Sequence, residues 1–161
     1  MKILSMKTTI FLGAMLSLLV CLMFTGCSNS ETNSTSRGLT DFAHIEEEYL
    51  ATIDSLNWPD GITLPDKLED EDTGASFQVG YGETRASYLW EYSWMKEWLD
   101  TYNTDPERAE KALEELEKAF DMPYMGIDRC DDATRNYLRE NIDKAKLGDP
   151  SGFTESIRAN Y

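Results

Sequence analysis

The sequence has little of the residue types that carry most metal binding and much of catalysis. It holds one histidine, His44, and three cysteines in 161 residues. His and Cys therefore cannot form the spaced pairs that bind structural zinc, and the chain shows neither a glycine-rich phosphate loop nor a serine nucleophile elbow. A thiol nucleophile usually needs a nearby base, and His44 is the only imidazole. We expect no metal site and no bound cofactor.

Basic residues are also scarce. The chain has 15 Lys and Arg against 30 Asp and Glu, which gives a formal net charge of −15. A surface with this charge stays soluble but repels the phosphates of nucleic acids and of anionic lipids. We therefore expect no nucleic acid partner, and any contact with a membrane should come through an attached lipid.

Long apolar runs are confined to the N-terminus. After Lys2 and Lys7 comes "TTIFLGAMLSLLVCLMF" at residues 8–24, followed by "TGC". A basic start, an apolar middle and small residues describe a secretory signal. The segment "FTGC" resembles the lipobox of bacterial lipoproteins, with Phe24 where Leu is more usual. The resemblance implies removal of the signal peptide, residues 1–26, and attachment of lipid, palmitate included, to Cys27. An uncleaved membrane anchor and a plain secreted form are the alternatives.

The resemblance covers the leader alone, and residues 39–161 resemble no family that we can identify. Residues 27–38 are small and polar and predict a flexible tether behind the lipid. Without the leader the chain keeps 13 basic and 30 acidic residues, a net charge of −17. We expect an exported protein anchored by lipid to the cell membrane, or to the outer membrane of a Gram-negative cell. Cys130 would then be a buried small hydrophobe, a free thiol or half of an intermolecular bridge.

Residues 39–161 predict an acidic all-α domain, a small bundle of about four helices with an irregular Pro/Gly/acidic loop at 57–76. Apolar residues spaced by 3 and 4 predict helices over 40–56, 76–102, 104–120 and 131–147, and a short last helix over 149–161. Thr40 is the expected cap of the first helix, Thr104 or Asp105 caps the third, and Gly148 ends the fourth. The acidic loop lacks the glycine and glutamate positions of a calcium loop and predicts a solvated segment.

The stretch "ASYLWEYSWMKEW", residues 86–98, concentrates five aromatic rings on one predicted helix. An apolar arc this wide is typical of a helix that other elements cover on two sides. The favoured interpretation is therefore the core of the domain. The residues that remain for solvent are Ala86, Ser93, Lys96, Glu97 and Asp100.

A narrow small-and-polar stripe interrupts these rings, formed by Gly80, Thr84, Ser87 and Glu91. It indicates either the close approach of another helix or a polar slot for a ligand. In the first case Gly80 and Ser87 give room, and the buried carboxylate of Glu91 pairs with Arg85, Arg135 or Arg139. In the second case Glu91 orients the ligand. The candidate binding residues are Tyr88, Glu91, Trp94, Ser87, Trp90 and Trp98.

These features favour an envelope-anchored, non-catalytic domain that binds a protein partner or a small ligand at the outer face of the membrane. One alternative is a carboxylate-based hydrolase of a wall glycan that uses Glu91. That chemistry needs a second carboxylate at about 5–10 Å. Glu83 and Glu97 lie on other faces of the predicted helix and do not supply it, and we assign no catalytic residue. A purely structural assembly subunit is the other alternative.

Overall fold

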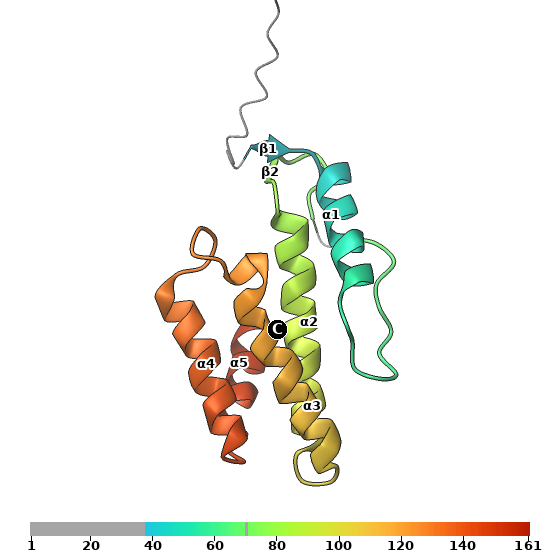
Figure 1. The fold of residues 1–161 in the computed structure, drawn as a ribbon. Coiled ribbons are helices and arrows are strands. Elements are labelled where there is room, and N and C mark those ends of the chain that lie inside the picture. The colour runs from blue at the N-terminus through green and yellow to red at the C-terminus, as the bar shows by residue number, and fades with distance from the viewer. Residues whose placement is uncertain (1–37, 70) are drawn as a thin grey trace, which may run out of the picture. The chain divides into compact units, whose positions relative to one another are not determined.

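The computed structural model describes residues 38–69 and 71–161 (Figure 1), so the predicted signal peptide, Cys27 and the predicted tether through residue 37 lie outside it. Helices dominate the described residues, and the predicted all-α fold is confirmed. The two strands are short and pair antiparallel, with Leu39 opposite Gln78. The elements, in chain order, are β1 (Leu39–Thr40), α1 (Phe42–Ser55), β2 (Phe77–Gln78), α2 (Tyr81–Thr101), α3 (Pro106–Glu117), the 3₁₀ turns η1 (Lys118–Asp121) and η2 (Pro123–Met125), α4 (Asp132–Lys146) and α5 (Ser151–Asn160).

Side-chain carboxylates set the starts of three helices. Asp41 caps α1 by accepting a hydrogen bond from the backbone N–H of His44, so the cap lies one residue after the predicted Thr40. Asp105 caps α3, as one of the two predicted residues, and Asp131 caps α4. An aspartate at this position satisfies N–H groups that the helix leaves free and suits its positive end. Gly148 ends α4 with φ +79°, as predicted.

The second helix starts later than the sequence pattern predicts. Residues 77–78 are extended and pair with β1, and Gly80 then turns the chain with φ +89°. This left-handed backbone conformation strongly favours glycine. The aromatic pattern that suggested a helix from residue 76 instead continues across a strand and a turn, because Phe77 packs on Tyr81 with ring centroids 5.5 Å apart.

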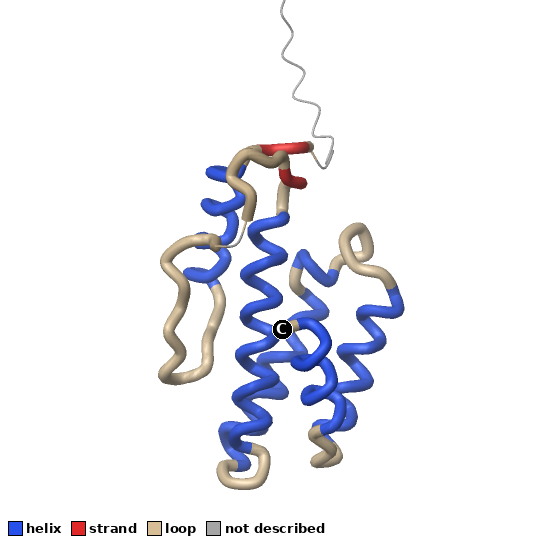
Figure 2. The backbone as a smooth tube through the Cα atoms, turned by 180° about the vertical axis from the view of Figure 1, so that it is seen from behind, coloured by secondary structure: helices blue, strands red, loops and turns tan. Residues whose placement is uncertain are grey.

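Helix α2 lies between α1 on one side and α4 and α5 on the other (Figures 1 and 2). A hydrophobic core fills each side, which confirms that α2 is covered on two sides. The smaller core joins α2 to α1 around Ile45, Tyr49 and Ile53. The larger core joins it to α3, α4 and α5 through Trp90, Trp94, Met95, Trp98, Leu116, Leu138, Ile142 and Phe153. Because both sides are covered, the prediction that Ala86 and Ser93 face solvent is wrong: they are 0% and 5% exposed.

Helices α1 and α2 approach each other closely at Gly82. A Cβ atom added there would lie 1.8 Å from the carbonyl oxygen of Ile45, a distance at which one of the helices must move. The expectation that Gly80 provides the room for a neighbouring helix is therefore wrong, whereas Ser87 is buried, at 0% exposed. Gly80 serves the turn, and a Cβ on it would meet the side chain of Arg129 rather than a helix backbone.

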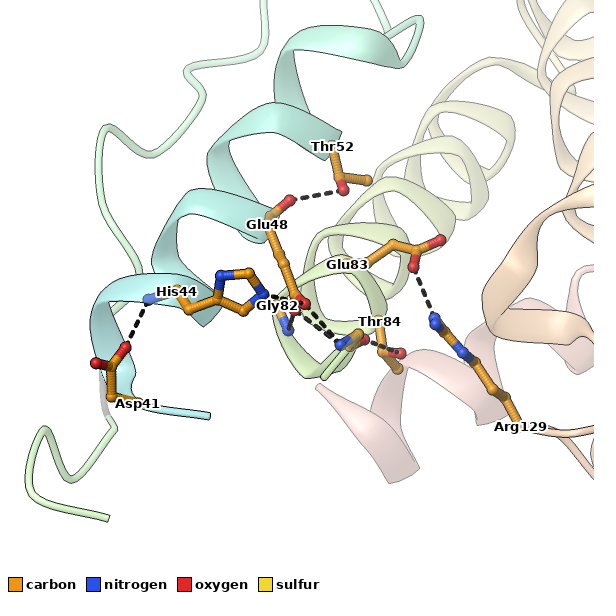
Figure 3. Close-up of polar contacts among 9 residues, drawn as sticks. Asp41, His44, Glu48, Thr52, Gly82, Glu83, Thr84 and Arg129 are labelled. Atoms are coloured by element: carbon orange, nitrogen blue, oxygen red, sulfur yellow. Dashed lines mark hydrogen bonds and ion pairs between the residues drawn. The ribbon is translucent and has the colours of Figure 1, made fainter. Parts of the chain in front are cut away.

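Glu48 of α1 holds the first turn of α2 in place (Figure 3). Its carboxylate accepts hydrogen bonds from the backbone N–H groups of Gly80 at 2.8 Å and Gly82 at 3.2 Å. These groups have no partner within the helix, so a carboxylate from another helix acts as their cap. Glu83, one residue further on, forms an ion pair with Arg129 at 2.7 Å and so ties the loop before α4 to α2.

Candidate ligand-binding site

The predicted site residues separate into two groups in the structure. Tyr88 and Glu91 line a pocket between α2, α4 and α5, whereas Ser87, Trp90, Trp94 and Trp98 are buried and do not line it. The slot expected between Tyr88 and Trp94 is therefore not formed, because Trp94 packs into the larger core. Trp98 lines a different cavity, of about 460 Å³, between α3 and α4.

Hydrogen bonds hold Trp90 and Trp94 in the core, and ring contacts hold Trp98 there. The indole N–H groups of Trp90 and Trp94 both donate to the backbone oxygen of Asn57, at 2.8 and 3.1 Å. Trp98 stacks on Tyr102 and meets Phe153 edge-on, with centroids 4.6 and 5.3 Å apart. A buried tryptophan usually satisfies its single donor in this way. The indoles of Trp90 and Trp94 therefore hold the segment after α1 against α2 and have no donor left for a ligand.

The pocket has a volume of about 660 Å³, and its walls come from separated parts of the chain. Volumes between about 300 and 1,000 Å³, with mainly apolar walls and a few polar groups, are typical of small-molecule sites. Glu91 is its only Asp, Glu, Lys, Arg or His among the described residues. The lining residues are Tyr88, Glu91, Met125, Ala133, Thr134, Tyr137, Leu138, Ser156, Ala159, Asn160 and Tyr161.

Glu91 is 8% exposed, and its carboxyl group faces Tyr124 of η2. The hydroxyl of Tyr124 donates to Oε2 of Glu91 at 2.8 Å. Burial raises the pKa of Glu91 to about 7, and the hydrogen bond from Tyr124 offsets only part of that effect. Burial and the neighbouring carboxylate also raise the pKa of Tyr124 above its ordinary value, so its hydroxyl remains a donor. Near pH 7 the pocket thus holds a carboxyl group that changes charge.

The prediction that Glu91 pairs with an arginine is wrong. Arg85 forms an ion pair with Glu71 of the acidic loop, and Arg139 lies over the ring of Phe120 at 4.5 Å. The guanidinium of Arg135 donates to the backbone oxygens of Met125 and Cys130 and pairs with Asp132. Within the described residues, Oε1 of Glu91 accepts no hydrogen bond, and the carboxyl has Tyr124 as its sole partner. It is a buried acid without a compensating cation.

Tyrosine rings surround this carboxyl. Tyr88 meets Tyr124 edge-on with centroids 5.7 Å apart and is 41% exposed. The hydroxyl of Tyr161 donates to the backbone oxygen of Tyr88 at 3.1 Å, and its ring packs on Tyr92 at 4.9 Å. This contact joins the end of α5 to α2 across one side of the pocket. The half-exposed ring of Tyr137 on α4 completes the aromatic part of the lining.

Cys130 lies near this region with intermediate exposure, and its Sγ is 3.5 Å from Sδ of Met125. Burial raises the pKa of its thiol, which keeps it protonated and poorly nucleophilic. His44 of α1 is exposed, and its Nε2 lies 3.4 Å from Oε1 of Glu48. Neither residue contributes to the lining.

Several residues of the site carry no signal in the sequence. Tyr124 lies in "DMPYMGIDRC", which has no helical periodicity and reads as a connection, yet its hydroxyl is the partner of Glu91. The apolar spacing places Tyr137 at the edge of the fourth predicted helix and Tyr161 on the short last helix, and it gives neither a role in binding. The position of η2 brings Tyr124 to Glu91, and the positions of α4 and α5 bring Tyr137 and Tyr161 to the same pocket. Periodicity within one helix does not predict which elements pack together.

No protein-family model, curated protein or solved structure matches the chain. Among the described residues, no helix is both long and apolar enough to cross a bilayer. Residues 38–69 and 71–161 also contain no group of three or more His, Cys, Asp or Glu side chains that could hold a metal ion. The proposed function therefore rests on the residues of the site.

Proposed function

We propose that this protein is an envelope lipoprotein, anchored through lipid on Cys27, whose helical domain binds a small organic ligand without catalysis. The ligand would occupy the pocket between α2, α4 and α5. The anchor rests on the sequence "FTGC" and on the polar segment after it. The ligand site rests on the pocket of about 660 Å³ and on its buried carboxyl.

The binding proposal rests mainly on the Glu91 carboxyl, which is buried and has no paired cation among the described residues. A carboxyl buried without a cation costs folding free energy, and its pKa of about 7 reports that cost. Binding sites commonly keep polar groups that are only fully satisfied when the ligand is present. Oε1 of Glu91 is free to accept a hydrogen bond from a ligand, and the surrounding rings supply apolar contact.

The binding proposal can be tested by recovering the ligand from the full-length protein. Protein purified from its own membranes in a mild detergent would be analysed by native mass spectrometry and by solvent extraction of bound small molecules. Ala159→Phe places a ring in the pocket, while Ala51→Phe makes the same change at an exposed position on α1 outside it. We expect a discrete bound mass in wild type and Ala51→Phe that Ala159→Phe lacks. The same mass in all three, or in none, would contradict the proposal.

The anchor is tested separately. Replacing Cys27 by Ser should abolish incorporation of labelled palmitate and leave a precursor that still carries residues 1–26. Cys130→Ser is the matched control, because it removes a cysteine of the helical domain and should leave labelling unchanged. Labelling that survives Cys27→Ser, or that depends on Cys130, would show that the lipid is attached elsewhere.

The described residues lend no support to the hydrolase alternative. Glycosidases place two carboxyl groups about 5–10 Å apart around the bond to be cleaved. Glu91 supplies the single acidic side chain among the described residues that line the pocket. Glu83 is paired with Arg129 and Glu97 with Arg108, and neither lines the pocket. For the assembly alternative, the most exposed apolar side chains, Ile127 and Leu147, flank opposite ends of α4 and do not form one patch.

A further inference from the structure

The side chains that line the pocket indicate the chemical class of the ligand. The lining contains one acidic side chain, that of Glu91, and no Lys, Arg or His among the described residues. The rings of Tyr88, Tyr137 and Tyr161 line the same space. A carboxylate beside aromatic rings is an arrangement with which proteins bind organic ammonium ions, through Coulomb attraction to the carboxylate and through the negative charge that the rings carry on their faces.

From this geometry we infer that the ligand is an organic ammonium cation, whose charged end lies at Glu91 between the tyrosine rings. The inference rests on the proposed binding function and names the ligand's chemical class. The cation would supply the opposite charge that Arg85, Arg135 and Arg139 do not provide, since each has other partners. An anion would meet Glu91 with no compensating base in the lining, so binding it would be unfavourable.

The rest of the molecule favours the same sign of ligand. The whole chain has a formal net charge of −15, and a field of this sign raises the local concentration of cations. The part of the pocket that Glu91 does not occupy is mainly apolar, with Met125, Leu138 and Ala159. A ligand with an ammonium end and an apolar body therefore matches both parts of the lining.

A choline titration against its neutral isostere, 3,3-dimethylbutan-1-ol, isolates the contribution of the charge. Both probes are small and water-soluble, and they differ at the central atom of the branched group, N⁺ in one and C in the other. Ligand-observed NMR of the full-length protein in detergent would give the affinity of each. We expect choline to bind at least about tenfold more tightly than the alcohol. In Glu91→Gln, which keeps the shape of the side chain, the two probes should bind about equally.

Choline binding should also depend on pH, since the ammonium competes with a proton for Glu91. Choline has no proton to lose in the tested range. With a pKa of about 7 for Glu91 in the free protein, the ionised fraction rises about tenfold from pH 6 to pH 8, and affinity should rise with it. Four other groups near the carboxyl have pKa values raised above their ordinary values, so they do not titrate between pH 6 and pH 8. They are Tyr88 on α2, Tyr124 on η2, Cys130 before α4 and Tyr161 after α5. On α4, the guanidinium of Arg135 pairs with Asp132, and Tyr137 lines the pocket.

The outcomes separate the ligand class from the function. Preference for choline that is lost in Glu91→Gln supports the inference. Equal binding of both probes in wild type, with loss in Ala159→Phe and not in Ala51→Phe, overturns the cation class and leaves the pocket as a binding site. Binding of neither probe to wild type overturns the cation inference, and recovery of a bound small molecule from membranes then decides the proposed function by itself.

Discussion

Replacing Glu91 by Gln should stabilise the free protein at pH 8 and leave its stability nearly unchanged at pH 5. The glutamine keeps the shape of the side chain and can still accept the hydrogen bond from Tyr124. It removes the charge that burial disfavours. The interpretation of α2 as core alone predicts the opposite result, because it gives Glu91 an arginine partner, and the loss of one member of a buried ion pair costs about 3–5 kcal/mol.

The magnitude follows from the pKa of Glu91, which is raised from 4.5 to about 7 on folding. Between these values the folded chain binds the proton and the unfolded chain does not. The free energy of unfolding therefore falls as pH rises through this window: the contribution of Glu91 is fully present below about 4.5 and is lost above about 7. At about 1.4 kcal/mol per pKa unit, the loss is about 3 kcal/mol.

Thermal unfolding of wild type and Glu91→Gln at pH 5 and pH 8 measures this difference. Because the variant is neutral at both values, its melting temperature should exceed that of wild type at pH 8 by on the order of 10 °C, and by little at pH 5. Glu110→Gln, an exposed change on α3, is the charge-matched control and should follow wild type at both pH values. A Gln variant that melts below wild type at pH 8 would mean that the carboxylate is well compensated in the free protein.

Three further substitutions test the packing that positions the pocket. Gly82→Ala should cost at least about 3 kcal/mol, because its Cβ would lie 1.8 Å from the backbone oxygen of Ile45, while Gly74→Ala, with ordinary contact at 3.4 Å, should cost far less in the same urea titration. Glu48→Ala removes the carboxylate that caps α2 and should lower the free energy of unfolding by about 1–2 kcal/mol, so an unchanged urea midpoint would contradict the capping role. Asn141→Leu should raise stability by about 1–2 kcal/mol in calorimetry, because Nδ2 of Asn141 is buried without a hydrogen-bond partner in the described residues, and a lower melting temperature would show that the amide is satisfied.

The sequence predicts the helices well where one local signal is sufficient. Apolar spacing identifies the buried residues Ile45, Tyr49 and Ile53 of α1, and the glycine signal places the end of α4 at Gly148. It fails where two elements meet. The exposure of Ala86 and Ser93 depends on which helices cover α2, and the start of α2 depends on a strand pair formed with residues 39–40.

In the candidate site, too, the sequence predicts features that depend on one helix and misses those that depend on contacts between elements. Glu91 stands out in the sequence because a carboxylate interrupts a run of aromatic residues, and the structure places it in a pocket with Tyr88. The tryptophans look equally suited to binding, but the N–H groups of Trp90 and Trp94 are used by Asn57 and the ring of Trp98 packs on Tyr102 and Phe153, which a pattern within α2 cannot reveal. The partner of Glu91 is likewise set by tertiary packing, since Tyr124 is 33 residues away in the chain.

The ionisation of Glu91 is the central feature of the site, and NMR can follow it directly. In protein labelled with ¹³C at glutamate side chains, the carboxyl signal of Glu91 is assigned by its absence from Glu91→Gln and is followed as pH is varied. We predict a midpoint of about 7 in the free protein, and a lower midpoint when choline is present. A midpoint near the ordinary value of 4.5 in the free protein would show that Glu91 is solvated or already paired, and would contradict a carboxyl held ready for a cationic ligand.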